Sequence, residues 1–241
     1  MERAKQRFIK NLPSIIDYTN LKSTARAEDI YKLCQDAIEY NFYAVCVNPC
    51  YIRSVYEWLK ERKNTDTKIC SVIDFPLGQS TMPQRIHQIK TLLNYTDEFD
   101  IVMNVGILKS KNYRYLNYEF KEIREFTKGK VIKMIIETPV LETHELTTIT
   151  ELIADNSFDF VKTATGAIDH PNLPPTKNLR DYFNFLYLVR DVKSIKEVLV
   201  KKNSPTKIKA AKGIDSIEKC QTLVDAGASR LGMSINVLKI I

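Results

Sequence analysis

The residues with the clearest chemical potential lie in the segment FVKTATG at positions 160–166. Its apolar character predicts a short buried strand, on which Phe160, Lys162 and Ala164 share one face because side chains alternate. Burial favours the neutral form of a lysine, and a neutral amine attacks carbonyl carbons to form a Schiff base. The segment alone leaves open a simpler interpretation, in which a lysine at a strand end extends its ammonium into water.

The pattern of apolar residues predicts eight strands that alternate with helices along the chain. The expected strands cover 15–19, 43–47, 69–75, 99–105, 130–137, 160–165, 207–211 and 228–234. A short helix over 3–12 lies outside this repeat. Ser23 or Thr24 is expected to cap the helix that follows the first strand, and Asp215 with Glu218 is expected to begin the last helix.

Strict alternation of strands and helices makes the sheet parallel, since each crossover is a helix. Eight units in 241 residues favour the α/β class and a (β/α)8 TIM barrel, formed by a single domain over 1–241. An open, doubly wound sheet is the alternative. No Gly-x-Gly-x-x-Gly or Walker loop follows the first strand, which weakens a nucleotide-binding function.

In such a barrel, one face of each strand packs on helices and the other points into the interior. Apolar residues on the helix-facing side therefore place their sequence neighbours inside, as Ile16 does for Asp17. The same alternation directs ionisable side chains inward from four further strands: Asp100, Lys133, Glu137, Lys162 and Lys209. Unpaired buried charge is costly, so this convergence favours an active site over an inert core.

The composition, 44% hydrophobic and 27% charged residues, is typical of a globular protein. No apolar run approaches the roughly 18 residues of a membrane span, and the N-terminus lacks an apolar signal segment, so we expect a cytoplasmic protein without membrane contact. The five cysteines match no common zinc spacing, and we expect reduced thiols and no metal. The net charge of +7 comes from dispersed lysines, which favours anionic small molecules over nucleic acid.

Several segments, in the same order, resemble the deoxyribose-phosphate aldolase family, and together they cover nearly the whole chain. They are IDYTNLK (16–22), AVCVNP (44–49), VIDFPLG (72–78), EFDIVMN (98–104), IIET (135–138), FVKTATG (160–166), IKA (208–210) and AGASRLG (226–232). The resemblance implies a class I aldolase that reversibly joins acetaldehyde to D-glyceraldehyde 3-phosphate, acts in deoxyribonucleotide catabolism and needs no cofactor. It leaves open a homodimer.

By position, the resemblance implies that Lys162 is the Schiff-base lysine, Lys209 its neighbouring lysine and Asp100 the proton-relay carboxylate, with Asp17 and Lys133 in the surrounding polar network. Elementary electrostatics agrees with these roles. Lowering the pKa of a lysine amine from 10.4 to about 7 takes roughly 4.6 kcal/mol. A second ammonium about 5 Å away supplies on the order of 3.3 kcal/mol at an effective dielectric near 20, and desolvation can supply the remainder.

Barrels of this type hold phosphate at the ends of strands seven and eight. The candidate ligands of the substrate and its phosphate are Thr165, Gly166, Gly213, Gly232 and Ser234. Three positions depart from the family: Lys212 where a glycine is usual, Ile235 where a small or hydroxyl residue is usual, and Asp74 where an added carboxylate is expected to repel an anion. These departures leave open an aldolase for another, unphosphorylated aldehyde. A non-enzymatic binder of sugar phosphates or nucleic acid is the third hypothesis.

Overall fold

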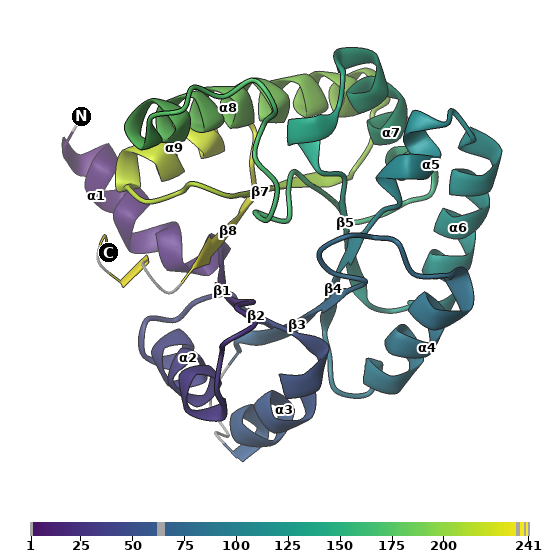
Figure 1. Ribbon diagram of the computed structural model, residues 1–241. Coiled ribbons are helices and arrows are strands. Elements are labelled where there is room, and N and C mark those ends of the chain that lie inside the picture. The colour runs from purple at the N-terminus through teal and green to yellow at the C-terminus, as the bar shows by residue number, and fades with distance from the viewer. Residues whose placement is uncertain (1, 62–65, 235–236, 239, 241) are drawn as a thin grey trace.

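Eight strands form the central sheet, and helices surround it (Figure 1). The structure is a computed structural model, and it describes residues 2–61, 66–234, 237–238 and 240. Neighbouring strands pair in parallel, and the last strand returns to the first, so the sheet closes into a barrel. The strands are β1 (Ile16–Asn20), β2 (Ala44–Val47), β3 (Lys68–Ile73), β4 (Glu98–Val102), β5 (Val131–Ile135), β6 (Phe160–Lys162), β7 (Lys207–Ala211) and β8 (Arg230–Ser234).

Helices connect successive strands and form the outer layer. They are α1 (Glu2–Asn11), α2 (Ala27–Glu39), α3 (Ile52–Glu61), α4 (Met82–Leu92), α5 (Val105–Lys109), α6 (Tyr113–Phe126), α7 (Thr143–Asp155), α8 (Lys177–Lys201) and α9 (Ile217–Ala226), with 3-10 turns η1 (Leu12–Ile15), η2 (Pro49–Tyr51) and η3 (Thr138–Val140). The predicted TIM barrel with a short N-terminal helix is therefore confirmed. No helix among the described residues is both long and apolar enough to cross a membrane.

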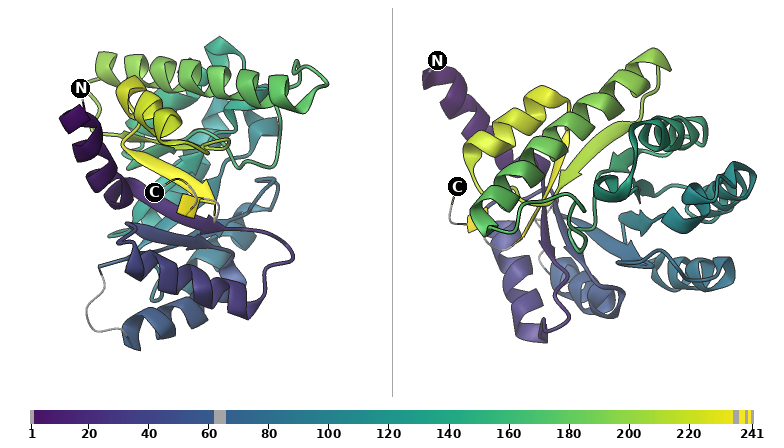
Figure 2. Two further views of the ribbon diagram at one scale, coloured as in Figure 1. Left: turned by 90° about the vertical axis from the view of Figure 1, so that its left-hand side faces the viewer. Right: turned by 45° about the horizontal axis from the view of Figure 1, so that its top comes forward.

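The main hydrophobic core fills the space between the barrel and its helices. Outward-facing strand residues such as Ile16, Ile132 and Ile208 are at most 1% exposed and belong to one buried cluster. The helix α1 lies outside the repeat and beside α9, where Lys5 pairs with Glu218 at 3.3 Å (Figure 2). The alternation of apolar residues thus assigns the outer face of the strands correctly, and the opposite face is left for polar groups.

Some predicted element boundaries are wrong because side chains in the loops stop the strands early. Strand β4 ends at Val102, since the side chain of Asn104 accepts a hydrogen bond from Ile107 N and begins α5. Strand β5 ends before Glu137, whose φ of 56° is left-handed. Helix starts were also misplaced. Arg26, with Asp29, begins α2 instead of Ser23 or Thr24, and Ser216 caps α9 instead of Asp215.

Candidate active site

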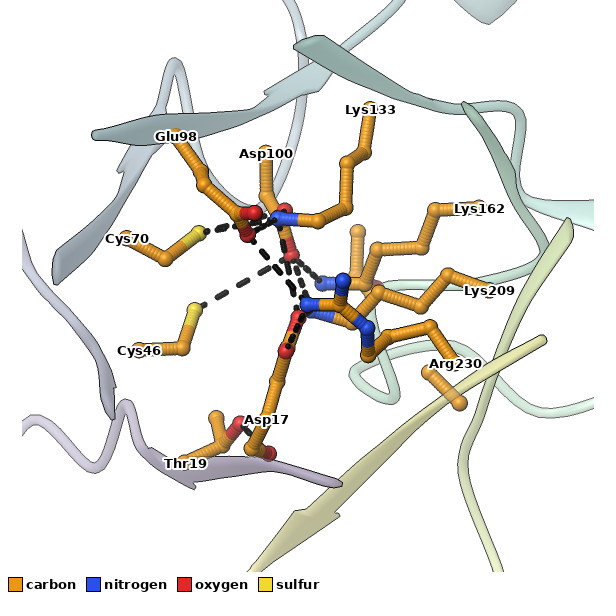
Figure 3. Close-up of polar contacts among 12 residues, drawn as sticks. Asp17, Thr19, Cys46, Cys70, Glu98, Asp100, Lys133, Lys162, Lys209 and Arg230 are labelled. Carbon is orange, nitrogen blue, oxygen red and sulfur yellow. Dashed lines mark hydrogen bonds and ion pairs between the residues drawn. The ribbon is translucent and has the colours of Figure 1, made fainter. Parts of the chain in front are cut away.

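The register of the barrel brings five of the six predicted ionisable residues together in its interior. The prediction is wrong for Glu137, which lies beyond the end of β5 and bonds to Thr165 instead. Asp100 pairs with Lys133 across β4 and β5, and Lys162 pairs with Lys209 across β6 and β7. Figure 3 shows these side chains, with Asp17 from β1, pointing toward one another. All five are at most 3% exposed. The alternation of side chains along five strands therefore predicted their convergence.

Asp100 lies at the centre of this cluster. Its Oδ2 accepts hydrogen bonds from both Lys162 Nζ and Lys209 Nζ, each at 2.7 Å, and its Oδ1 accepts one from Lys133 Nζ at 2.9 Å. Because the first two bonds end on the same oxygen, the two lysine nitrogens are no farther apart than twice 2.7 Å. Two ammonium groups at that separation repel each other strongly in a dry interior.

The carboxylates fix the charge of the lysines around them. Burial alone would lower the pKa of Lys209, but the carboxylates of Asp100 and Asp17 outweigh it and raise that pKa. Burial likewise opposes ionisation of Asp100, yet Lys133, Lys162 and Lys209 hold its pKa well below the ordinary value. The same balance raises the pKa of Lys133, against burial, chiefly through Asp100. In the resting site at neutral pH, Lys209 and Lys133 are therefore protonated and Asp100 is ionised.

Two further charged residues belong to the cluster and were not predicted. Arg230 on β8 donates to Asp17 Oδ1 at 2.8 Å and lies 3.6 Å from Glu98 Oε2. Glu98 is 1% exposed and lies 2.5 Å from Lys133 Nζ. Glu98 stands two positions before Asp100, on the same face of the strand, and Arg230 bears the same relation to Gly232. The alternation of side chains along each strand was therefore sufficient to predict that Glu98 and Arg230 point into the barrel.

Two buried thiols also contact Asp100. Cys70 Sγ donates to Oδ1 at 3.2 Å, and Cys46 Sγ lies 3.9 Å from Oδ2. Burial raises the pKa of Cys70 well above its ordinary value, so this thiol keeps its proton. Within the described residues, these three side chains are the group whose donor atoms are close enough for a metal ion. The carboxylate oxygens already accept bonds from three lysines, so the donor set does not suit a cation.

A pocket of about 330 Å³ opens at the carboxyl ends of β1, β6, β7 and β8. Lys162 lines it, whereas Lys133 and Lys209 do not. All the predicted ligands of the substrate and its phosphate also line it: Thr165, Gly166, Gly213, Gly232 and Ser234. The structure thus places these five residues around the one lysine of the cluster that reaches the pocket.

Two glycine turns at the pocket use left-handed backbone. Gly166 has φ of 86° and Gly213 has φ of 67°, and a Cβ at either position would meet no atom within 4 Å. The space beside their backbone is therefore open to a ligand. Next to Gly166, Thr165 donates its backbone N–H and its hydroxyl to Glu137, and burial raises the pKa of that carboxyl group. Glu137 thus fixes the orientation of the loop after β6.

The three departures from the family have different outcomes. The expectation that Asp74 repels an anion is wrong. Its carboxylate is 7% exposed, accepts from Arg85 Nε at 2.7 Å and from Ser80 Oγ at 2.7 Å, and does not line the pocket. Lys212 does line the pocket, and its ammonium pairs with Asp169. Ile235 lies outside the described residues.

Several known proteins that are similar to this chain are named deoxyribose-phosphate aldolase. The deoxyribose-phosphate aldolase of Dictyoglomus turgidum is 39% identical over 223 residues, which are 92% of this chain and 92% of that protein. The deoxyribose-phosphate aldolase of Mycoplasmoides pirum is 34% identical over 228 residues, 94% and 95% of the two chains. The tetrameric deoxyribose phosphate aldolase of Aeropyrum pernix matches the fold with a TM-score of 0.77 at 26% identity, over 97% of this chain and 93% of that one. No family profile matches the chain.

Proposed function

The chain belongs to the deoxyribose-phosphate aldolase family, and on this premise we propose that Lys162 carries out the family's reaction as a Schiff-base nucleophile. The protein is an aldehyde-lyase, a class I aldolase, that reversibly cleaves 2-deoxy-D-ribose 5-phosphate into acetaldehyde and D-glyceraldehyde 3-phosphate. One observation carries the choice of lysine. Of the three lysines that contact Asp100, Lys162 is the one that also lines the pocket.

A count of charges supports a neutral amine on Lys162. The cluster contains three carboxylates and four basic side chains: Asp17, Glu98 and Asp100 against Lys133, Lys162, Lys209 and Arg230. An uncompensated buried charge is costly, so the cluster is balanced when one base is neutral. Arginine does not deprotonate. Lys133 lies near three carboxylates and Lys209 near two, whereas Lys162 has a single carboxylate partner.

The neutral amine of Lys162 attacks C1 of the open-chain sugar, and loss of water gives an iminium ion. The iminium withdraws the electron pair of the C2–C3 bond as the C3 hydroxyl loses its proton, so D-glyceraldehyde 3-phosphate leaves and an enamine remains. Protonation of the enamine at C2 and hydrolysis release acetaldehyde and restore the lysine. Asp100 lies 2.7 Å from Lys162 Nζ, so we assign it the proton transfers, by way of a water molecule. Asp17 and Lys133 hold Asp100 and Lys209 in place.

The phosphate binds in the same pocket, at the ends of β7 and β8. Its ligands are the backbone N–H groups of Gly166, Gly213 and Gly232 and the hydroxyl of Ser234. Thr165, whose hydroxyl donates to Glu137, lines the substrate side of the pocket. Lys162 and this anion site line one pocket, so both ends of a five-carbon sugar phosphate are held together. A cytoplasmic location, a role in deoxyribonucleotide catabolism and a homodimer stay predictions.

The proposed function is tested by two measurements on the same preparation. A coupled assay follows release of D-glyceraldehyde 3-phosphate from 2-deoxy-D-ribose 5-phosphate. In parallel, the protein is incubated with acetaldehyde and borohydride, and the reduced adduct is mapped by peptide mass spectrometry. We expect turnover together with an N-ethyl group on Lys162. Turnover with the adduct on another lysine would reject the assigned nucleophile, and absence of turnover would reject the substrate.

Gly232 gives a further prediction, because its missing side chain makes room for Lys209. A Cβ at position 232 would lie 3.1 Å from Lys209 Cε and 3.2 Å from Ala211 Cβ. We expect Gly232→Ala to displace Lys209 from Asp100, to lower the free energy of unfolding by about 1 to 3 kcal/mol and to lower kcat/KM by about tenfold. Chemical denaturation and the coupled assay measure the two effects.

The control is Gly129→Ala, at a turn with φ of 80° where a Cβ meets no atom within 4 Å. It should lower stability through backbone strain and leave kcat/KM unchanged. Equal kcat/KM for Gly232→Ala and the unmodified protein would show that Lys209 tolerates the added methyl group.

A further inference from the structure

Lys212 occupies a costly backbone conformation at the rim of the pocket. It follows the last residue of β7 and has φ of 89°, in the left-handed region that residues other than glycine rarely adopt. Such conformations persist where the surrounding structure requires them, and they are frequent at ligand sites. Apart from the proposed nucleophile Lys162, it is the one basic residue lining this pocket among the described residues.

The ammonium of Lys212 is held by the loop between β6 and α8. It donates to the backbone oxygen of Ile168 and lies 2.6 Å from Asp169 Oδ1. The Lys212 side chain is 16% exposed, whereas that of Asp169 is 50% exposed. The hydrogen bond from Lys212 lowers the pKa of Asp169. The carboxylate is therefore ionised at neutral pH and neutralises the charge that Lys212 would otherwise present to the pocket.

An exposed carboxylate is a weak competitor for this ammonium. An ion pair open to solvent contributes little, because water and salt screen it. A phosphate group carries up to two negative charges and three acceptor oxygens, so it binds the same ammonium more strongly than one carboxylate does. A lysine ammonium has three donors. It can therefore keep its bond to Ile168 while it changes its anionic partner.

We propose that Lys212 is a ligand of the substrate's phosphate and that Asp169 is an internal anion which the phosphate displaces. The proposal rests on the function proposed above and adds a determinant of substrate choice. Lys212 makes the pocket selective for phosphorylated sugars, while Asp169 holds the ammonium in place and weakens its affinity for the anion. Phosphate binding releases the side chain of Asp169 from Lys212, while the bond from Lys212 to the backbone oxygen of Ile168 keeps the loop between β6 and α8 at the rim of the pocket.

Two variants with opposite expected effects test this exchange. The quantity measured is selectivity, the kcat/KM for 2-deoxy-D-ribose 5-phosphate divided by that for unphosphorylated 2-deoxy-D-ribose. We expect Lys212→Met to lower selectivity by about 10- to 100-fold, the usual effect of removing a hydrogen bond to a charged group. We expect Asp169→Asn to raise it about two- to fivefold, because the competing charge is gone. Inorganic phosphate, titrated as an inhibitor, should bind most tightly to Asp169→Asn, less tightly to the unmodified protein and least tightly to Lys212→Met.

If the ion pair only fastens the loop, both variants lower activity on both substrates and selectivity stays constant, which overturns the proposal. A fall in selectivity for Asp169→Asn also overturns it. Lys202→Met is the matched control, since Lys202 forms an ion pair with Asp155 at 2.8 Å and neither residue lines the pocket. It should change selectivity less than twofold. Trapping of acetaldehyde on Lys162 needs no phosphate. Failure of trapping therefore rejects the proposed aldolase function. Trapping without a change in selectivity rejects only the proposed roles of Lys212 and Asp169.

Discussion

Replacing Lys162 with methionine is expected to lower kcat/KM for cleavage of 2-deoxy-D-ribose 5-phosphate by at least about 10,000-fold. The covalent route is lost with the amine, and the remaining groups only bind and orient the sugar. The fold should survive, because three carboxylates then face three cations and Asp100 keeps its bonds to Lys133 and Lys209. We expect the free energy of unfolding to change by less than about 1.5 kcal/mol. The coupled assay and denaturation measure the two quantities.

Lys193→Met is the matched control for this variant. Lys193 lies on α8 with an exposed side chain, so the same substitution there changes the surface alone and should leave kcat/KM unchanged. Borohydride should trap acetaldehyde in the control and not in Lys162→Met. Residual turnover within about tenfold of the unmodified protein, at equal stability, would mean that another group provides the nucleophile.

The two-residue period of strands explains why much of the site was predictable. Asp17, Asp100, Lys133, Lys162 and Lys209 each follow or precede an apolar residue that must face a helix, so their direction is fixed locally. Their depth within the barrel is also fixed, because parallel strands have a defined register. Convergence of charge could therefore be inferred from residues far apart in sequence.

Contacts made by loops and by long side chains were not predictable in the same way. The pair of Asp74 and Arg85 joins the turn after β3 to α4, and the pair of Lys212 and Asp169 joins two loops. No periodicity relates such residues, and the backbone at Asp74 and Lys212 has positive φ, which their residue types do not favour. The wrong expectation for Asp74 has this origin. Its side chain turns toward Arg85, away from the pocket.

Replacing Lys209 with methionine tests the electrostatic part of the mechanism. Three basic side chains then face three carboxylates, so the cluster is balanced when Lys162 is protonated. The variant removes the repulsion between the two ammonium groups, and it removes the bond that Lys209 donates to Asp100. Both changes favour the protonated form of Lys162. We expect kcat/KM at pH 7 to fall by about 100- to 1,000-fold, and we expect the acid limb of its pH profile to move to higher pH. Activity should recover partly as pH rises. A pH series of the coupled assay measures both effects.

The direction in which the acid limb of the pH profile moves is the decisive observation. Damage to the fold lowers activity but does not move the acid limb to higher pH. Lys207→Met removes a positive charge from the same strand at an exposed position, so it controls for long-range charge effects and should leave the limb in place. A limb that stays fixed in Lys209→Met, or moves to lower pH, would contradict the role of Lys209. The neutral amine of Lys162 would then have to arise from desolvation alone, and since Asp100 accepts a hydrogen bond from that amine at 2.7 Å, desolvation would have to outweigh a bond that favours the proton.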